Sequence, residues 1–177
     1  AVYIKEKSGL KRDLKIVFRV FDDGVGFRYE FPQQPGLNEF EIAKENTEFH
    51  FTQPLKAWWI PAYKEVYYES LARYTPLDQM DTVCTPLTIE TGDGRFLAIH
   101  EANLTDYAKM NLYPVDSATL ACDLTPWSNG IKVYAKAPCV TPWRTIIIAE
   151  NINELVTSNI MLNLNEPSKI DSGSWIR

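Results

Sequence analysis

The sequence has 177 residues, 45% of them hydrophobic, which is enough for one domain with a sizeable core. Its net charge of −5 argues against nucleic acid and anionic membranes as partners, and no apolar run approaches the roughly 18 residues of a membrane span. Three cysteines without a C-x-x-C pair disfavour a zinc site or a disulfide framework, so we expect buried free thiols. A Cys122–Cys139 disulfide is the alternative if their strands are neighbours.

The strongest pattern near the start of the chain is an alternation of apolar and polar residues over 14–21. The sequence Asp22-Asp23-Gly24 follows, and a second alternating run covers residues 25–31. Asp and Gly between two such runs are typical of a hairpin turn. We therefore predict an antiparallel pair of strands here.

Shorter runs bounded by Pro or Gly predict further strands over residues 40–42, 47–51, 87–91, 95–100, 119–124, 131–137 and 143–149. Seven or more short strands with turn residues between them predict an all-β, antiparallel sandwich or barrel. Residues 151–158 are predicted to form one short helix. Residues 160–164 are expected to be a last strand or part of a loop.

Two segments do not fit a simple series of strands. Residues 58–74 are aromatic and irregular, and predict a long excursion between strands. Its aromatic residues are expected to pack against the sandwich or a partner domain, and stacking on sugar rings is the alternative. These residues are Trp58, Trp59, Tyr63, Tyr67, Tyr68 and Tyr74. The tail 166–177, with Pro167 and Gly173, resembles a linker toward a further domain.

Carboxylates are the only plentiful reactive groups, because the chain has two histidines and lacks a G-x-S-x-G elbow. Glycoside hydrolysis needs two carboxyl groups on either side of the scissile bond. The spacing of the candidates pairs no two of them, so we predict no catalytic dyad within this chain. These candidates are Glu65, Glu69, Asp78, Asp81, Glu101 and Asp106.

Glu101 is the most informative of these acids. It follows the apolar run Phe96–Ile99, which predicts a buried strand, so its carboxylate is expected where that strand leaves the core. Such a carboxylate is held rigidly and could reach a cation or a neighbouring domain. Calcium takes six to eight oxygen ligands, and without a D-x-D-x-D-G loop any calcium site here must be assembled from distant segments.

The hairpin sequence FRVFDDGVGFRYEF, residues 18–31, resembles the N-terminal domain of glycoside hydrolase family 97. Later segments resemble the same family in the same order, at residues 45–49, 57–63, 85–89 and 101–107. The end of the chain, Ser174 to Arg177, is similar to the junction before the family's catalytic barrel. The resemblance covers nearly the whole chain.

This resemblance implies a bacterial, exo-acting α-glucosidase or α-galactosidase that hydrolyses terminal α-linked sugars of an oligosaccharide. It implies a galactose-mutarotase-like supersandwich over residues 1–165, and a linker over residues 166–177 toward a (β/α)8 barrel of the same polypeptide. It also implies an active-site Ca²⁺ to which Glu101 gives one ligand, while the catalytic residues lie in the barrel. This chain alone is then inactive. The resemblance also implies a periplasmic or secreted location.

The chain departs from the family pattern at its start, where family members carry more sandwich sequence before Lys5. We therefore expect a sandwich truncated on its N-terminal side, with exposed sheet edges that favour association. The main alternative function is a stand-alone carbohydrate-binding sandwich without catalysis, which would bind glycans through Trp58, Trp59 or Tyr63. A scaffold or interaction domain without catalysis is a third possible function.

Overall fold

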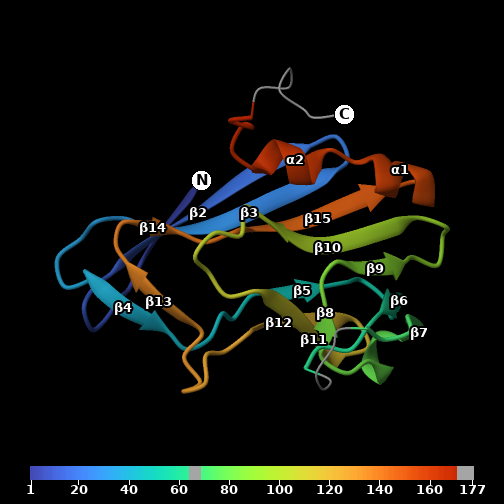
Figure 1. The fold of residues 1–177 in the computed structure, drawn as a ribbon, viewed down its shortest axis with the longest axis horizontal. Coiled ribbons are helices and arrows are strands. Elements are labelled where there is room, and N and C mark those ends of the chain that lie inside the picture. Colours follow the sequence, from blue (N-terminus) through green and yellow to red (C-terminus); the bar gives the residue numbers. More distant parts are fainter. Residues whose placement is uncertain (64–68, 171–177) are drawn as a thin grey trace.

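The protein is a sandwich of antiparallel β-sheets with two short helices on one outer face (Figure 1). The structure, a computed structural model, describes residues 1–63 and 69–170. The all-β, antiparallel sandwich predicted from the sequence is confirmed. In the described part of the chain, no helix is both long and apolar enough to cross a membrane.

Among the residues that the structure describes, nine strands form the larger sheet, and the predicted hairpin lies within it. Asp22 and Asp23 form the turn of that hairpin, because Phe21 pairs with Gly24. In spatial order the strands are β1 (Val2–Lys5), β2 (Asp13–Phe21), β3 (Gly24–Phe31), β15 (Trp143–Ala149), β10 (Phe96–Ala102), β9 (Leu87–Glu90), β6 (Lys56–Trp59) and β7 (Arg73–Pro76), and β14 (Cys139–Val140) also pairs with β3.

A smaller sheet faces part of the larger one, and a separate strand pair lies beside it (Figure 1). In spatial order, the smaller sheet comprises β5 (Glu48–His50), β12 (Thr119–Leu124), β11 (Met110–Asp116) and β8 (Val83–Cys84). The separate pair comprises β4 (Glu39–Ile42) and β13 (Val133–Lys136). A 3-10 turn, η1 (Leu77–Gln79), follows β7.

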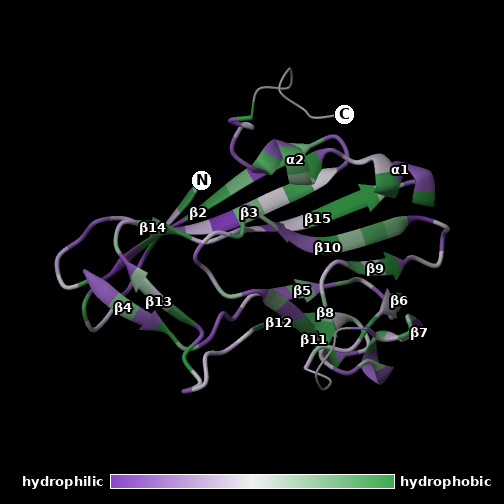
Figure 2. Cartoon of the chain, in the orientation of Figure 1, coloured by the Kyte–Doolittle hydropathy of each residue, from purple (hydrophilic) through white to green (hydrophobic). Residues whose placement is uncertain are grey.

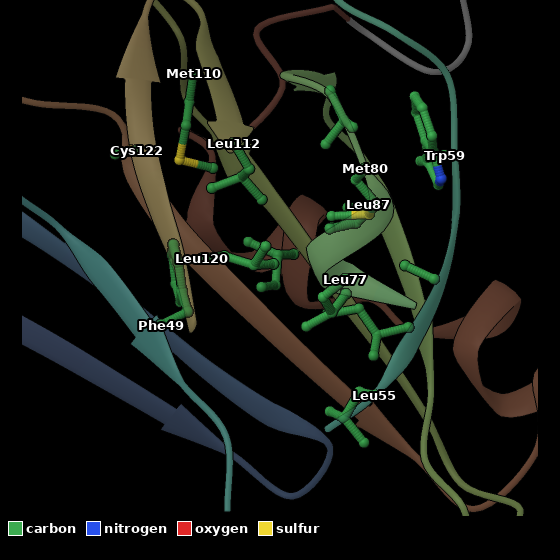
Figure 3. Close-up of a cluster of buried hydrophobic side chains, with 14 of the residues drawn as sticks. Phe49, Leu55, Trp59, Leu77, Met80, Leu87, Met110, Leu112, Leu120 and Cys122 are labelled. Carbon is green, nitrogen blue, oxygen red and sulfur yellow. The ribbon is translucent and has the colours of Figure 1, made fainter. Parts of the chain in front are cut away.

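The main core fills the space between these two sheets (Figure 3). Alternating residues of facing strands supply it, and Ile89, Ile99, Leu112 and Leu120 are fully buried. Removing a large apolar side chain from such a core typically lowers the free energy of unfolding by about 2–5 kcal/mol. The sandwich therefore positions strands β10 and β15 rigidly, with one face of each toward the core.

The two helices cover the outer face of the larger sheet, and they correct one prediction. Residues 160–164 form helix α2, not a strand or loop, because Ile160 and Leu164 stand one helical turn apart and both are buried against the sheet. Helix α1 (Ile152–Thr157) lies within the predicted helix and is capped by the Asn151 side chain. Figure 2 shows the hydrophobic β15 running beneath them.

The aromatic segment, strand β11 and the cysteines differ in how well the sequence predicted them. The expectation of an irregular excursion over residues 58–74 is wrong at both ends, where β6 and β7 pair with each other. Strand β11 was not predicted, because Pro114 and Asn111 interrupt its apolar pattern.

All three cysteines are free thiols, with Cys84 and Cys122 buried as expected.

Candidate functional site

Glu101 lies within strand β10 and faces the core. The strand runs past the predicted end at His100 to Ala102, so Glu101 is not at the point where the chain leaves the sheet. Its partner across the sheet is Arg144 of β15, and directly opposed residues of neighbouring strands share one face. The buried Ile99, two residues earlier, is on this same face. Glu101 therefore points inward.

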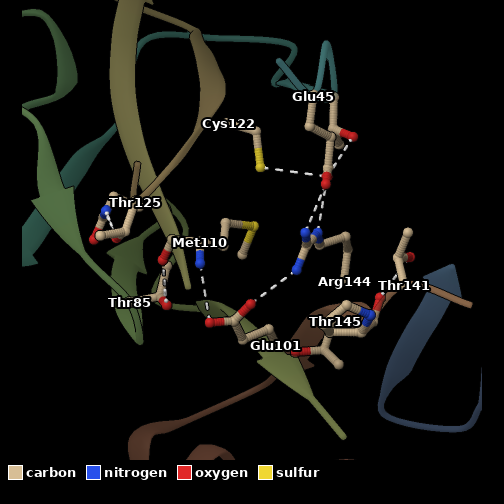
Figure 4. A network of polar contacts seen from close by, with 12 residues as sticks. Glu45, Thr85, Glu101, Met110, Cys122, Thr125, Thr141, Arg144 and Thr145 are labelled. Carbon is tan, nitrogen blue, oxygen red and sulfur yellow. Dashed lines mark hydrogen bonds and ion pairs between the residues drawn. The ribbon is translucent and has the colours of Figure 1, made fainter. Parts of the chain in front are cut away.

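Arg144 joins two buried carboxylates (Figure 4). Its Nε and Nη2 donate to the two carboxylate oxygens of Glu45, at 2.8 and 2.6 Å. Its Nη1 donates to Oε2 of Glu101 at 2.8 Å. The side chains are 0% exposed for Arg144, 7% for Glu45 and 3% for Glu101. The three residues form a closed ionic cluster, which we call the Arg144 cluster.

Neutral groups complete the hydrogen bonds of the Arg144 cluster. The Met110 backbone N–H donates to Oε1 of Glu101 at 3.0 Å, and the Thr47 hydroxyl donates to Oε1 of Glu45 at 2.9 Å. The Tyr107 ring lies against the guanidinium, with 5.7 Å between its centroid and the Arg144 Cζ. Tyr107 belongs to the loop between β10 and β11, so this loop covers the cluster.

The charges of the Arg144 cluster do not balance, because two carboxylates share one guanidinium. Burial alone would raise the pKa of Glu45, but the bidentate contact with Arg144 outweighs burial and holds that pKa below its ordinary value. For Glu101, burial dominates and raises the pKa, with Arg144 and the Met110 N–H offsetting it only in part. Glu101 has one contact with the guanidinium where Glu45 has two, so Arg144 offsets the charge of Glu101 less completely.

Calcium fits this arrangement as an ion to which the chain gives one ligand. A carboxylate has about four lone-pair positions, and Glu101 uses two of them here. A cation on Glu101 would also balance the extra negative charge. Within residues 1–63 and 69–170, no three His, Cys, Asp or Glu side chains gather as a metal site. A calcium ion on Glu101 would need its further ligands from outside these residues, and the Glu101 side chain, 3% exposed here, would have to become accessible to it.

The structure does not place the other predicted carboxylates in this cluster. Glu69, Asp78, Asp81 and Asp106 are exposed, and Glu65 lies outside the described residues. Glu45 and Glu101 are the acids that are brought together, and both are directed at the same guanidinium. This contact is an ion-pair arrangement, whereas a glycosidase dyad has its two carboxyl groups across a substrate bond.

The predicted aromatic cluster divides into packed and exposed rings. Trp59 is 4% exposed and its indole N–H donates to Thr75 at 3.0 Å. Trp58 is 48% exposed and stacks on Tyr74, with 4.6 Å between ring centroids. The Tyr63 hydroxyl donates to Asp123 at 2.8 Å. Packing thus accounts for Trp59. The predictions for Tyr67 and Tyr68 lie outside the described residues.

Sequence reasoning missed Glu45 and Arg144 as members of the site. Arg144 occupies a core-facing position of β15, in line with Ile146, and such a buried arginine needs carboxylate partners. That signal was available, since an arginine within an apolar strand is unusual. Its partner Glu45 is 99 residues away in the sequence, and no local pattern joins them.

A comparison with known families decides the identity of the fold. The family model for the glycosyl-hydrolase 97 N-terminal region matches residues 1–167. The chain belongs to glycoside hydrolase family 97. The family 97 resemblance seen in the sequence is thereby confirmed, and the sandwich described above is the N-terminal region of that family.

Solved and curated relatives agree with this assignment. A family 97 enzyme from Pseudoalteromonas sp. strain K8, solved in complex with acarbose, is 44% identical over 98% of this chain, with a TM-score of 0.91. A retaining α-galactosidase from Bacteroides thetaiotaomicron is 21% identical over 94% of the chain. A β-arabinopyranosidase shares the fold, with a TM-score of 0.72 and 21% identity over 84% of the chain.

This family 97 chain spans only part of these relatives. It covers 26% of the Pseudoalteromonas enzyme and 30% of the Bacteroides galactosidase. What the structure describes is therefore the N-terminal region of glycoside hydrolases, and most of the length of the relatives lies outside it.

Proposed function

We propose that this chain is the non-catalytic N-terminal part of a bacterial exo-acting α-glycosidase. The full polypeptide hydrolyses terminal α-linked glucose or galactose, and its catalytic residues lie in a (β/α)8 barrel that follows the linker at residues 166–177. Support comes from the Bacteroides α-galactosidase and from the Pseudoalteromonas enzyme, which was solved with acarbose and, as a variant, with panose.

The observation that carries the proposal is the excess negative charge of the buried Arg144 cluster, in which Glu101 has a single contact with the guanidinium. We propose that Glu101 gives one carboxylate ligand to an active-site calcium ion, and that the barrel gives the others. When bound, the ion would offset negative charge that develops on the reacting oxygen atoms. Glu45 takes Nε and Nη2 of Arg144, and Glu101 shares the same guanidinium through Nη1 alone, so the cluster keeps one negative charge that a metal ion could offset. The Met110 N–H orients the other oxygen of Glu101.

Hydrolysis by the full gene product tests this function. The gene is sequenced past Arg177, and its product is assayed on nitrophenyl α-glucoside and α-galactoside, with and without EDTA. Release of one sugar that EDTA abolishes and added calcium restores is expected, and it names the substrate. A stop codon near Arg177, or no hydrolysis with or without calcium, would contradict the proposal.

Location is a separate part of the proposal. We propose that the protein works in the periplasm or outside the cell, where oligosaccharide substrates arrive first. Cell fractionation should then recover the α-glycosidase activity in the osmotic-shock fluid or the medium. Recovery of the activity with a cytoplasmic marker enzyme would contradict this location.

A carbohydrate-binding module without catalysis is the second candidate, and the exposed Trp58–Tyr74 pair favours it. Two stacked rings at a sheet edge offer a flat apolar surface to a sugar ring. Under this alternative the isolated chain binds glycans and Trp58→Ala abolishes binding. The enzyme proposal expects little binding by the isolated chain through this pair.

A further inference from the structure

A hollow of about 550 Å³ is lined in part by Tyr107, the residue whose ring contacts Arg144. It is bordered by the β10–β11 loop, by residues 125–127 and by β13. Three of its residues are aromatic, namely Tyr107, Trp127 and Tyr134. Its size is within the usual range for small-ligand sites. Tyr107 lines the hollow, and its ring also lies 5.7 Å from the Arg144 Cζ, so this one residue links the hollow to the Arg144 cluster.

The two outer rings of the hollow are exposed but held in place. Trp127 is 62% exposed and Tyr134 is 52% exposed, and their centroids are 6.4 Å apart. The Trp127 backbone N–H donates to Ile131 O at 2.8 Å, and its carbonyl accepts from Gly130, which closes a tight turn. The Asn129 side-chain amide donates to the Tyr134 hydroxyl. These contacts fix the turn that carries Trp127 and hold the Tyr134 hydroxyl before any ligand arrives.

Unused polar groups lie beside these rings. Among the described residues, neither the Asp106 carboxylate nor the Trp127 indole N–H has a hydrogen-bond partner. Asp106 also has a positive φ of 48°, a conformation that non-glycine residues seldom adopt. One acceptor and one donor thus accompany exposed aromatic faces, a combination that suits a ligand with both C–H faces and hydroxyl groups.

The charges of the hollow indicate a neutral ligand. Both lysines that line the hollow are already engaged. The Lys132 ammonium group donates to Asp123 at 3.0 Å and to the Leu124 carbonyl, and the Lys109 ammonium group donates to Cys84 Sγ at 3.3 Å. The unpaired Asp106 carboxylate would repel a phosphate or carboxylate group. A neutral polyhydroxyl ring satisfies both conditions, because its hydroxyls donate to Asp106 and its apolar face stacks on an aromatic ring.

We propose that this hollow is an oligosaccharide subsite, in which Trp127 and Tyr134 stack on a pyranose ring remote from the bond that is cleaved. This inference rests on the proposed function, which places Glu101 at the active site of the full enzyme. The subsite extends the contact of the substrate from Glu101 across Tyr107 to the sandwich. Trp127 then governs the preference for longer substrates and takes no part in bond cleavage.

The test compares long and short substrates in the full-length enzyme. Trp127→Ala is expected to raise KM for panose about tenfold, while kcat for panose and both constants for nitrophenyl α-glucoside or α-galactoside stay within twofold. Trp127→Phe, which keeps an aromatic face, should restore most of the panose affinity. Tyr3→Ala is the matched control, because it removes an exposed aromatic ring on β1, 80% exposed and outside both the hollow and the Trp58–Tyr74 pair, and should leave both substrates unchanged.

Panose and maltotriose titrations by calorimetry, on protein inactivated by removal of calcium, separate this inference from the proposed function. If sugars bind and Trp127→Ala weakens binding about tenfold, the subsite stands even where no hydrolysis is seen. If hydrolysis is normal and Trp127→Ala changes neither KM nor binding, the subsite is wrong and the proposed function survives. Equal losses in Trp127→Ala and Tyr3→Ala, or a lower melting temperature of Trp127→Ala with unchanged sugar binding, would also overturn the subsite and indicate a packing role for Trp127.

Discussion

Arg144 is a fully buried cation that depends on carboxylates from two distant parts of the chain. Glu45 precedes β5 and Glu101 lies on β10, so the Arg144 cluster ties both sheets together through charge-assisted hydrogen bonds. Buried ion pairs of this kind are strongly sensitive to the loss of one partner, because the charge that remains stays desolvated. The cluster therefore couples the interior of the sandwich to the residue proposed to reach calcium.

Replacing Arg144 by methionine should destabilise the protein by about 3–5 kcal/mol, because Glu45 and Glu101 would be left buried without a cation. Urea unfolding of the variant and the wild type measures this difference. The triple variant Arg144→Met, Glu45→Gln, Glu101→Gln removes every charge of the cluster and should recover much of the loss. Arg95→Met is the surface control, because the Arg95–Glu150 pair is exposed and screened by solvent, so its loss should change stability far less. Similar losses in the two single variants would contradict this role of Arg144.

The raised pKa of Glu101 predicts a specific pH dependence. A carboxyl whose folded pKa is raised contributes stability that is present below its ordinary value near 4.5, and this stability is lost as pH rises through the folded pKa. In EDTA, the melting temperature of Glu101→Gln relative to wild type should therefore fall as pH drops from 7 toward 4.5. Glu30 is the control, because its pKa is lowered, so the wild-type advantage over Glu30→Gln should shrink only below about pH 4.5. A pH-independent difference for Glu101→Gln would contradict the prediction.

Strand β3 and helix α2 pack closely because position 26 lacks a side chain. A Cβ atom on Gly26 would lie 2.5 Å from Cδ1 of Leu164, and Leu164 is itself buried against the sheet. The apolar pair Ile160 and Leu164 can therefore lie flat on β3 and β15. This contact explains why a short segment that reads as a strand or loop becomes a helix.

Gly26→Ala should destabilise the protein by about 1–3 kcal/mol, because Leu164 must shift to admit the new methyl group. Thermal and urea unfolding measure the loss. In the double variant Gly26→Ala, Leu164→Ala the two effects should be less than additive, since the smaller side chain makes room. Gly92→Ala is the matched control, because no atom lies within 4 Å of its Cβ position. Additive losses in the double variant would show that the two residues do not compete for space.

Elements defined by a pattern of adjacent residues could be predicted from the sequence. Elements defined by packing between distant residues could not. The β2–β3 hairpin could be predicted, because alternation and the Asp22-Asp23-Gly24 turn are properties of adjacent residues. Helix α2 could not be predicted, because its two buried residues pack against a surface that Gly26, far away in the sequence, leaves open. The sequence singled out Glu101 through its family motif. The ion pairs of Glu101 arise from the register of β10 against β15, which no local pattern predicts.

The larger sheet has an uncovered apolar strip where the smaller sheet ends. Val2, Ile4, Phe18 and Val20 are 43% to 79% exposed, and their cross-strand partners place them on the face that carries Phe27 of the core. Strand β5, the edge of the smaller sheet, has a free pairing side among the described residues. An exposed apolar surface beside an open edge favours association with another chain.

The isolated 177-residue chain should therefore associate as its concentration rises, and sedimentation velocity measures this. Val20→Lys should shift the distribution toward monomer, because it places a charge in the apolar strip. Val156→Lys is the control, because Val156 is equally exposed, at 79%, but on helix α1. A monomer at every concentration, or the same shift in both variants, would contradict the role of this strip.

The most direct test of the whole account is a calorimetric calcium titration of the full gene product and its Glu101→Gln variant. The account predicts one tight calcium site in the wild type, about tenfold or more weaker in the variant, because a charged ligand is lost. Glu48→Gln, which changes an exposed acid on β5, should bind calcium like the wild type. Equal calcium affinity in the wild type and Glu101→Gln would contradict the proposal that the sandwich contributes to the active site.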